Sequence, residues 1–525
     1  RDRLYEYTGG LQVGEPAAAM GHPLTVELGP GLLGGIYDGL LRPLEEASEF
    51  LRPTGLTRPP AGAYEFEPAV GTGELVEPGT LLGRVTTRST VEHLVITPPG
   101  IGGSVDRIAS RGRYRSAETI VVIDGSDVAL NSEWAVRSPR PYLWRNPVRE
   151  PFRTGQRVLD ILLPIAKGNS ATVIGGFGEG KTMLLEQLAK WGDADVIIYV
   201  GCGERGNELT DLIGELNELV DPRSGRRLRE RTIILANTSN MPVMAREASI
   251  YTAVTLAEYY RDMGHHAVII ADSTSRWAEA QRELASRTGA IPAEEGYPAD
   301  LPASLAAFYQ RAGRVTTLGE RDGTVTIITS VSPPGGDVTE PVAAHTQRFV
   351  QAMWSLDRDL AYARHYPAVS WRSSFSRDGD AIGRWHAAHE SPNWSRHRSR
   401  LRSLLAEADR LVDIADLVGL SALPPEERLV LLTGRLIREA ILQQNALSET
   451  DASCSAAKQV ELTEAVLAVH DAALRLAAAG VPTTILEEFD YGPIVRARDA
   501  TDSDDAQGVR RICERVLADL EELSS

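Results

Sequence analysis

One glycine-rich octapeptide limits the possible folds of this chain more than any other stretch. It runs from Gly175 to Thr182, reads Gly-Gly-Phe-Gly-Glu-Gly-Lys-Thr, and matches the pattern G-x-x-x-x-G-K-[ST]. The apolar run 171–174 precedes it, and the helix-favouring stretch 183–190 follows it. Because the pattern requires a strand before the loop and a helix after it, we predict a phosphate-binding loop. The alternative is a glycine turn that happens to precede a lysine, and the two flanking elements argue against it.

Each part of this loop suits contact with a triphosphate. The glycines let backbone N–H groups point at phosphate oxygens, and the N-terminus of the following helix adds positive potential. Lys181 can neutralise the β- and γ-phosphates, and the Thr182 hydroxyl can bind Mg²⁺. The candidate nucleotide-binding residues here are Gly175, Gly176, Phe177, Gly178, Glu179, Gly180, Lys181, Thr182 and Met183.

Hydrolysis also requires a carboxylate near the metal and a group that orients water. The apolar run 267–271 ends in Asp272, and Glu204 lies in a glycine-rich segment after the apolar run 196–200. Carboxyl ends of parallel strands converge on a ligand crevice, where Asp272 can reach the metal shell and Glu204 can hold a water. Each acid also has an ordinary interpretation, as a helix N-cap and as a surface residue in a loop. The candidate catalytic residues are Glu204, Lys181 and Arg205, and the candidate metal-binding residues are Thr182 and Asp272.

Buried-looking strands alternate with helical stretches between about residues 150 and 375. Runs of Val and Ile without polar alternation predict strands covered on both faces, joined by helices that make parallel crossovers. The predicted strands are 171–174, 196–200, 231–236, 267–271 and 324–330. We therefore expect an α/β core that carries the chemistry.

The regions on either side of this core have different patterns. Between about residues 45 and 136, short β-type runs at 81–85, 93–96 and 119–123 are separated by turn signals, which predicts a β-rich domain. After residue 377, apolar residues recur at helical spacing, which predicts a helical domain. The predicted helix faces contain Leu429, Leu432 and Leu436; Leu462, Val466, Val469, Ala473 and Leu476; and Ile512, Val516, Leu520 and Leu523.

Composition limits the partners and the compartment. The chain has 525 residues, so we expect three or so globular domains. A formal net charge of -17 leaves no large basic face, which disfavours a nucleic-acid partner. The three widely spaced cysteines fit a reducing compartment, and neither a bilayer-spanning run nor a signal-peptide core is present. We expect a cytoplasmic protein that meets a membrane only through its partners.

Several long and unusual stretches occur between about residues 5 and 460. They are 26–34, 139–142, 154–158, 201–208, 236–242, 271–279, 294–298 and 332–337. Together with the glycine loop, they closely resemble the catalytic A subunits of vacuolar/archaeal-type (V/A-type) rotary ATPases and ATP synthases. The resemblance implies a RecA-like P-loop core with an N-terminal β-barrel remnant, an inserted β-rich bulge domain and a C-terminal helical domain.

The resemblance also implies domain boundaries. Residues 1–22 would be the partial β-barrel, 23–45 with 137–376 the P-loop nucleotide-binding domain, 46–136 the bulge domain, and 377–525 the C-terminal helical domain. No bulge domain of this kind is expected in the B-type or F-type relatives of the family.

The activity that the resemblance implies is hydrolysis or synthesis of ATP, coupled to proton or sodium transport across a membrane. The cofactors would be ATP/ADP and Mg²⁺. Three A and three B subunits would alternate in an A3B3 hexamer with central and peripheral stalks, and the B subunit would supply the arginine finger. By their motif positions, Lys181 and Thr182 would hold ATP and Mg²⁺, Glu204 would polarise the attacking water, and Asp272 would stand in the second shell of the metal. Tyr366 would stack on adenine, for which an aromatic face suffices.

Three departures from the family pattern lead to expectations of their own. Residues 5–16 resemble only the last strands of the family's N-terminal barrel, which implies that about half of that barrel is missing. Glu179 occupies a loop position that is usually small, and we expect its carboxylate to point outward, because an inward charge would oppose phosphate. Leu447 replaces an aromatic residue that helps close the adenine pocket, so we expect reduced nucleotide affinity.

Two other classes of function are weighed against this one. One is a homohexameric machine, either a secretion ATPase, which would lack the insertion of about 90 residues before the glycine loop, or a ring helicase, which would need a basic RNA-binding face. A degenerate nucleotide-binding subunit with a structural role is the other alternative, suggested by Glu179, Leu447 and the N-terminal difference. Lys181, Thr182, Glu204 and Asp272 are all in place, which argues against loss of chemistry.

Overall fold

The computed structural model describes residues 14, 16, 21–44, 62–176, 178–221 and 223–524. The chain divides into two compact units. Unit 1 contains Arg1–Val148, Lys167–Ile174 and Ala194–Val350, and unit 2 contains Arg149–Ala166, Gly175–Asp193 and Gln351–Ser525. Most of the expected barrel remnant, the start of the expected bulge domain and Phe177 lie outside the described residues.

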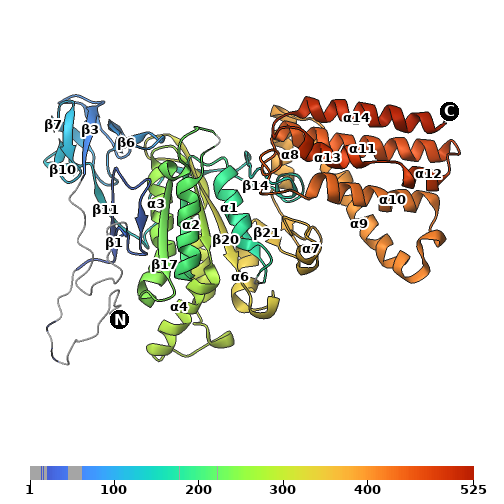
Figure 1. Cartoon of the computed structure of the whole chain (residues 1–525). Helices are drawn as coiled ribbons and strands as arrows, with labels where there is room; N and C mark the ends of the chain where they lie inside the picture. The colour runs from blue at the N-terminus through green and yellow to red at the C-terminus, as the bar shows by residue number, and fades with distance from the viewer. Residues whose placement is uncertain are drawn as a thin grey trace. The chain divides into compact units, whose positions relative to one another are not determined.

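A parallel sheet forms the centre of unit 1 (Figure 1). Its strand order is β2-β17-β16-β18-β20-β15, and every pair of neighbours in that series is parallel. The bounds are β2 Ile36–Tyr37, β15 Ser170–Ile174, β16 Val196–Glu204, β17 Thr232–Thr238, β18 His266–Asp272 and β20 Asp322–Val331. Antiparallel β19 (Gly313–Thr316) and β12 (Trp144–Asn146) extend it beyond β20. The strands predicted from Val- and Ile-rich runs are all present, and the α/β core is confirmed.

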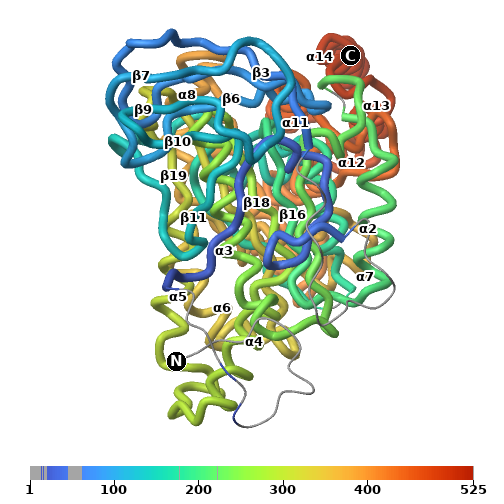
Figure 2. The backbone as a smooth tube through the Cα atoms, turned by 90° about the vertical axis from the view of Figure 1, so that its left-hand side faces the viewer, coloured from blue at the N-terminus to red at the C-terminus, as the bar shows by residue number. Residues whose placement is uncertain are grey.

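Helices cover this sheet and separate its strands along the chain. Their bounds are α2 Gly206–Glu218, α3 Val243–Asp262, α4 Thr274–Arg287, α5 Leu301–Tyr309 and α6 Pro341–Phe349. Helix α3 packs on β16, β17, β18 and β20, and nearly all its residues are buried (Figure 2). Charged side chains are among its buried residues, and they are paired: Glu258 with Arg311 and Asp262 with Arg140, as burial of charge requires.

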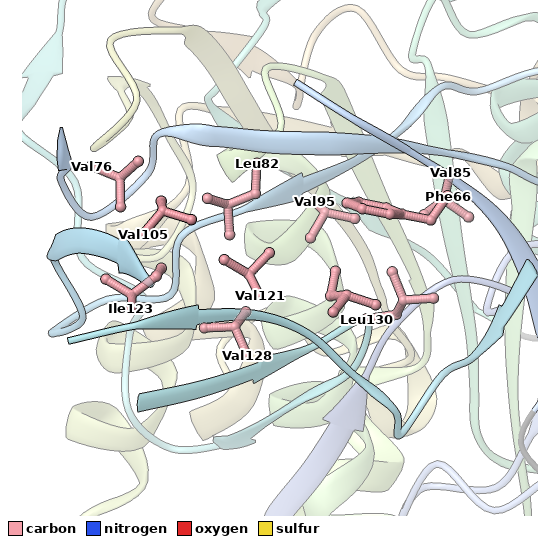
Figure 3. Packing of buried hydrophobic residues seen from close by; sticks show 11 residues of the cluster. Phe66, Val76, Leu82, Val85, Val95, Val105, Val121, Ile123, Val128 and Leu130 are labelled. Carbon is pink, nitrogen blue, oxygen red and sulfur yellow. The ribbon is translucent and has the colours of Figure 1, made fainter. Parts of the chain in front are cut away.

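The described part of the region before the sheet is rich in antiparallel strands. Two four-stranded sheets have the orders β6-β5-β3-β8 and β10-β9-β7-β4. The bounds are β3 Ala63–Pro68, β4 Leu75–Val76, β5 Leu81–Thr86, β6 His93–Ile96, β7 Gly103–Ile108, β8 Gly112–Arg115, β9 Thr119–Ile123 and β10 Ser126–Ala129. β1 (Thr25–Leu28) pairs with β11 (Ser132–Ala135). One apolar cluster that includes Phe66, Leu82 and Val121 fills the space between the two sheets (Figure 3).

Unit 2 contains the helix after the glycine loop and the C-terminal helices. The helices are α1 Lys181–Trp191, α7 Arg358–Tyr362, α8 Gly379–His389, α9 Trp394–Val418, α10 Pro425–Leu436, α11 Ala456–Ala478, α12 Thr483–Glu488, α13 Gly492–Ala500 and α14 Ala506–Glu521. Short strands are β13 Pro151–Phe152, β14 Ile165–Ala166, β21 Ala352–Ser355 and β22 Phe375–Ser376. The predicted apolar faces of α10 and α11 are buried, whereas Ile512 in α14 is only half-buried and Cys513 beside it is buried. None of the helices in the described ranges combines the length and apolar character needed to cross a bilayer.

Candidate active site

The carboxyl ends of four consecutive strands of unit 1 lie at one edge of the parallel sheet. Ile174 at the end of β15 pairs with β20, β20 pairs with β18, and Asp272 at the end of β18 pairs with Gly201 of β16. Because the strands are parallel and in register, their ends meet on the same side. The glycine loop follows Ile174 directly in the chain, and Asp272 and Glu204 end β18 and β16 of the same sheet.

Glu204 is the last residue of strand β16, so the strand is longer than the run 196–200 that we predicted. Strand β16 continues past residue 200 and ends at Glu204, which pairs with Thr238. A bulge between Cys202 and Glu204 interrupts the register, and Gly203 there has φ of 74°. Glycine adopts this left-handed conformation at little cost, so the strand can bend without ending. We predicted that this strand ends at residue 200 because Gly201 and Gly203 follow, and glycine inside a strand normally weakens it.

The environment of Glu204 makes its ionisation unfavourable. Burial, together with the carboxylates of Asp272 and Glu208, raises the pKa of Glu204 to about 8, although the guanidinium of Arg276 opposes the change. A carboxyl group that titrates close to neutral pH can exchange a proton with water under working conditions. A strongly shifted carboxyl at a strand end is also typical of functional sites.

Asp272 is held in place by the neighbouring strand. The Ser330 hydroxyl donates a hydrogen bond of 2.5 Å to Asp272 Oδ1, and both side chains are buried. Thr274 in turn donates to the Ser330 carbonyl at 3.0 Å. These contacts orient the Asp272 carboxylate from the side of β20. The N-cap position of α4 is occupied by Ser273 and not by Asp272.

The glycine loop of unit 2 has the backbone that a phosphate-binding loop requires. Gly178 and Gly180 have φ of 81° and 92°, a conformation that residues with a Cβ rarely adopt. Helix α1 begins at Lys181, and the Lys181 Nζ donates to the carbonyls of Gly175 and Gly176 at 2.6 Å each. The lysine therefore bridges the start of the loop to the start of the helix. Thr182 and Met183 follow as exposed residues in the first turn of α1.

Glu179 folds back over the loop, so the expectation that its carboxylate points outward is wrong. Glu179 Oε2 accepts a hydrogen bond of 2.6 Å from the N–H of Gly176. A methyl group added to Gly175 or Gly176 would lie 2.8 Å or 2.6 Å from a Glu179 carboxylate oxygen. The physical reason is that backbone N–H groups of such a loop attract an anion, and the Glu179 carboxylate is close enough to be that anion.

Replacing Glu179 by Ser should tighten nucleotide binding by roughly tenfold. Removing one carboxylate near the phosphates removes a like-charge repulsion of about 1–2 kcal/mol at the effective dielectric of a half-buried site. The measurement is the Kd for ATP from a titration with a fluorescent ATP analogue. Glu514→Ser in α14, an exposed position, is the control and should leave the Kd unchanged. An unchanged or weaker affinity in Glu179→Ser would show that the carboxylate moves away before phosphate enters.

An aromatic ring lies beside the loop in unit 2. A methyl group added to Gly180 would stand 3.6 Å from Cε1 of Tyr366, and the Tyr366 side chain is 42% exposed. The Tyr366 carbonyl accepts a hydrogen bond of 2.7 Å from the N–H of Gln444. Leu447, three residues later, has a side chain that is 87% exposed. A half-exposed ring beside a phosphate-binding loop can stack on a nucleobase, whereas the Leu447 side chain lies in the solvent.

The remaining candidates and two residues that the sequence did not single out lie around Glu204 in unit 1. Arg205 is largely exposed and stands 3.8 Å from Glu208. Arg276 and Arg246 pack against Gly203, the residue before Glu204, because a methyl group on Gly203 would meet Arg276 Cβ at 2.8 Å and Arg246 Cδ at 3.2 Å. Arg246 lies in α3 and Arg276 lies in α4. They come close to the end of β16 because both helices pack on that strand, and this packing is not visible in the sequence around either arginine.

Comparisons with known proteins agree with this geometry. The family model described as "ATP synthase alpha/beta family, nucleotide-binding domain" matches residues 155–376. The models for the "ATPsynthase alpha/beta subunit barrel-sandwich domain" and the "C-terminal domain of V and A type ATP synthase" match residues 59–137 and 383–485.

Relatives of similar length extend these matches over most of the chain. The V-type ATP synthase alpha chain of Nitrosococcus oceani is 48% identical over 509 residues, which cover 94% of this chain and 86% of that protein. The corresponding A-type ATP synthase chain of Thermofilum pendens is 44% identical, with 99% and 89% covered. A solved ATPase from a type III secretion system of pathogenic bacteria has a TM-score of 0.58 over 84% of this chain and 99% of its own, at 22% identity, and so shares the fold. This chain therefore belongs to the ATP synthase alpha/beta family, and within it to the A (alpha) subunits of V- and A-type ATP synthases.

Proposed function

We propose that this chain is the catalytic A subunit of a V/A-type rotary ATPase, which hydrolyses or forms ATP while other subunits move protons or sodium ions across a membrane. The observation that carries the proposal is the sheet edge described above. A glycine loop of the nucleotide-binding type follows β15 directly in the chain, and two acids end β18 and β16, which are neighbours in the same sheet. The family membership supports the same conclusion.

The loop and helix α1 would bind the triphosphate. Backbone N–H groups of residues 178–182 and the positive end of α1 favour the phosphate charge. The Lys181 ammonium, now bonded to loop carbonyls, would turn to the β- and γ-phosphates, since a lysine has three donors that can be shared. The Tyr366 ring would stack on adenine.

Thr182 and Asp272 fit a magnesium ion by their chemistry. Both offer hard oxygen donors, and Mg²⁺ prefers such donors, few protein ligands and several waters or phosphate oxygens. Within the described ranges, no group of three or more His, Cys, Asp or Glu side chains could hold a metal by itself. When bound, Mg²⁺ supplies positive charge that neutralises the β- and γ-phosphate oxygens.

Glu204 would orient and polarise the attacking water. A carboxylate does this by accepting a hydrogen bond from the water, and a pKa of about 8 makes the group a stronger base than an exposed Glu. Arg276 lies on the same side and would limit the rise of that pKa. We include Arg205 as a residue that could move toward the phosphates, since its ion pair with Glu208 is exposed and therefore weak.

The assembly implied by the family is an alternating hexamer with B subunits, a central stalk and a peripheral stalk. The chain would meet the membrane only through an ion-translocating sector, and it would have a cytoplasmic, membrane-peripheral location. The secretion ATPase alternative is not favoured, because the similarity to that protein, at 22% identity, extends to the fold alone.

Co-expression of this chain with a candidate B subunit should give an A3B3 assembly that hydrolyses ATP. Native mass spectrometry reports the stoichiometry, and a coupled assay reports the rate with and without Mg²⁺. We expect hydrolysis to require both subunits, because the B subunit would supply the arginine finger. We also expect hydrolysis to stop when EDTA removes Mg²⁺, because the ion neutralises the phosphate charge. An assembly that binds ATP but never turns over would instead support the alternative of a degenerate, structural role.

A further inference from the structure

Arg157 is a buried cation that the proposed chemistry does not use. Its side chain is fully buried in unit 2, and it immediately precedes a short π-helix, Val158–Leu162. Removing a guanidinium from water is costly unless several acceptors replace the lost hydration. The contacts of Arg157 therefore show what the structure uses it for.

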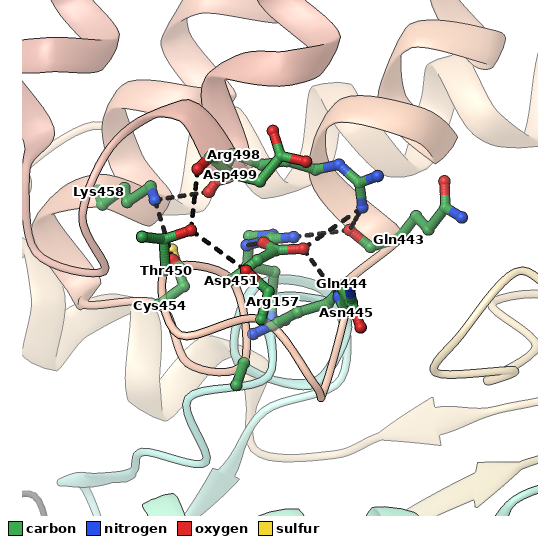
Figure 4. Close-up of polar contacts among 12 residues, drawn as sticks. Arg157, Gln443, Gln444, Asn445, Thr450, Asp451, Cys454, Lys458, Arg498 and Asp499 are labelled. Atoms are coloured by element: carbon green, nitrogen blue, oxygen red, sulfur yellow. Dashed lines mark hydrogen bonds and ion pairs between the residues drawn. The ribbon is translucent and has the colours of Figure 1, made fainter.

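Four of those contacts lead to one loop, residues 443–451, and to the helix end before it (Figure 4). Arg157 Nε donates to the Ile441 carbonyl at 2.7 Å, and Nη2 donates to the Gln443 carbonyl at 2.6 Å. Nη1 forms an ion pair of 2.7 Å with Asp451, whose side chain is also buried. The backbone N–H of Arg157 donates to Gln444 Oε1 at 2.9 Å. One side chain thus joins both ends of the 443–451 loop.

Other contacts of the loop reinforce this arrangement. Asp451 Oδ2 accepts from the N–H of Asn445 at 2.8 Å, and Gln444 Nε2 donates to the Gly155 carbonyl at 2.8 Å. Arg498 Nη1 donates to the Gln443 carbonyl at 2.8 Å and stands 3.5 Å from Asp451. The planar guanidinium of Arg157 donates hydrogen bonds to two carbonyls in different directions and places its charge beside Asp451.

The 443–451 loop is in turn bonded to the residue that we place at the nucleobase. The Gln444 N–H donates to the Tyr366 carbonyl at 2.7 Å, and the Tyr366 ring lies beside Gly180 of the glycine loop. A displacement of Gln444 would therefore shift the backbone that carries the ring. The phosphate-binding part of the site is held by different contacts, since Lys181 donates to carbonyls of the glycine loop itself.

We propose that Arg157 is a positioning residue for the nucleobase: it holds the 443–451 loop against Tyr366 and so sets the affinity for the base, without touching the nucleotide. This inference rests on the proposed function, because it needs ATP bound at the glycine loop with its base at Tyr366. It separates the site into a phosphate side, which is independent of Arg157, and a base side, which depends on it.

The test compares ATP with inorganic tripolyphosphate, which has the phosphates but no base. In the A3B3 assembly, Arg157→Lys keeps the charge beside Asp451 but cannot reach the Ile441 and Gln443 carbonyls together. We expect the KM for ATP to rise roughly tenfold and kcat to change less than about threefold, as for lost ground-state binding. The Ki of tripolyphosphate as a competitive inhibitor should stay within about twofold, since its binding needs no base pocket.

Two further variants keep the test decisive. Arg231→Lys is the matched control, because Arg231 is similarly buried, is paired with Asp221 and lies in unit 1, and it should shift neither constant. If Arg157→Lys lowers the yield of folded protein, Arg498→Lys replaces it. Arg498 is partly exposed and donates to the same Gln443 carbonyl. Its replacement should raise the KM for ATP about threefold and leave the Ki of tripolyphosphate unchanged.

The outcomes distinguish this inference from the proposed function. A wild-type assembly without ATP turnover would overturn the proposed function. The positioning role of Arg157 alone would be overturned by a different result. In that result the wild-type assembly turns over ATP normally, and Arg157→Lys changes the KM for ATP and the Ki of tripolyphosphate equally or changes neither.

Discussion

Replacing Glu204 by Gln should lower kcat for ATP hydrolysis by roughly 100-fold or more, while the Kd for ATP changes less than about threefold. Removing one group that stabilises the transition state typically costs about 3–4 kcal/mol of barrier. Gln has nearly the same shape and keeps a hydrogen-bond acceptor, but it cannot take up a proton or carry charge. The rate is measured on the A3B3 assembly, and the affinity by titration with a fluorescent analogue.

The pH dependence gives this prediction an independent readout. Because the pKa of Glu204 is raised to about 8, the carboxylate fraction should increase with pH, and kcat/KM should rise from about pH 6, pass its midpoint near pH 8 and level off above about pH 9. This rising limb should disappear in Glu204→Gln. The control is Glu215→Gln, an exposed position on helix α2, which follows β16, and it should keep both the rate and the pH profile. Unchanged turnover in Glu204→Gln would refute the assignment of Glu204.

Replacing Lys181 by Met should weaken ATP binding by roughly 100-fold or more. The ammonium group would lose its charge-assisted hydrogen bonds to two phosphates, each worth about 1.5–3 kcal/mol. Arg should not restore the affinity, because its planar guanidinium is larger and cannot fit between the carbonyls of Gly175 and Gly176, which lie 2.6 Å from the present ammonium. Isothermal titration calorimetry with ATP measures the change.

A matched substitution at the other end of α1 shows whether the effect is local. Lys190→Met removes a lysine from the same helix, one that packs over the Trp191 ring. It should change ATP affinity less than about twofold, because the last turn of α1 is remote from the glycine loop. If Lys181→Met binds ATP with wild-type affinity, the glycine loop does not hold the phosphates in the way that we propose.

The fold and the chemical type of the site could be predicted because their signals are local. Apolar runs such as 267–271 predicted the strands, since only a strand covered on both faces tolerates four or five consecutive Val, Ile and Ala residues in this setting. The glycine loop was predicted because its backbone requires glycine at Gly178 and Gly180, and such requirements are visible in the residues themselves. The long stretches of family resemblance added the expected roles of Glu204, Asp272 and Tyr366, whose functions stay predictions until the variants are measured.

Features that depend on contacts between distant residues were decided by the tertiary structure. From the sequence alone we predicted that Glu179 points outward, but its carboxylate accepts a hydrogen bond from the N–H of Gly176. The secondary-structure propensity of a residue does not predict which hydrogen-bond partner its side chain selects. The pKa of Glu204 depends on burial and on Asp272, two strands away in the order of the chain. Arg157 had no signal beyond its motif, since its partners lie nearly 300 residues later.

The sequence by itself therefore determined which elements form and which chemistry they carry, because backbone conformation and apolar periodicity are properties of neighbouring residues. Only the tertiary structure decided where each charge lies and what it touches. Electrostatic energies and hydrogen bonds depend on distances of a few ångströms between segments that are far apart in the chain, and folding alone sets those distances.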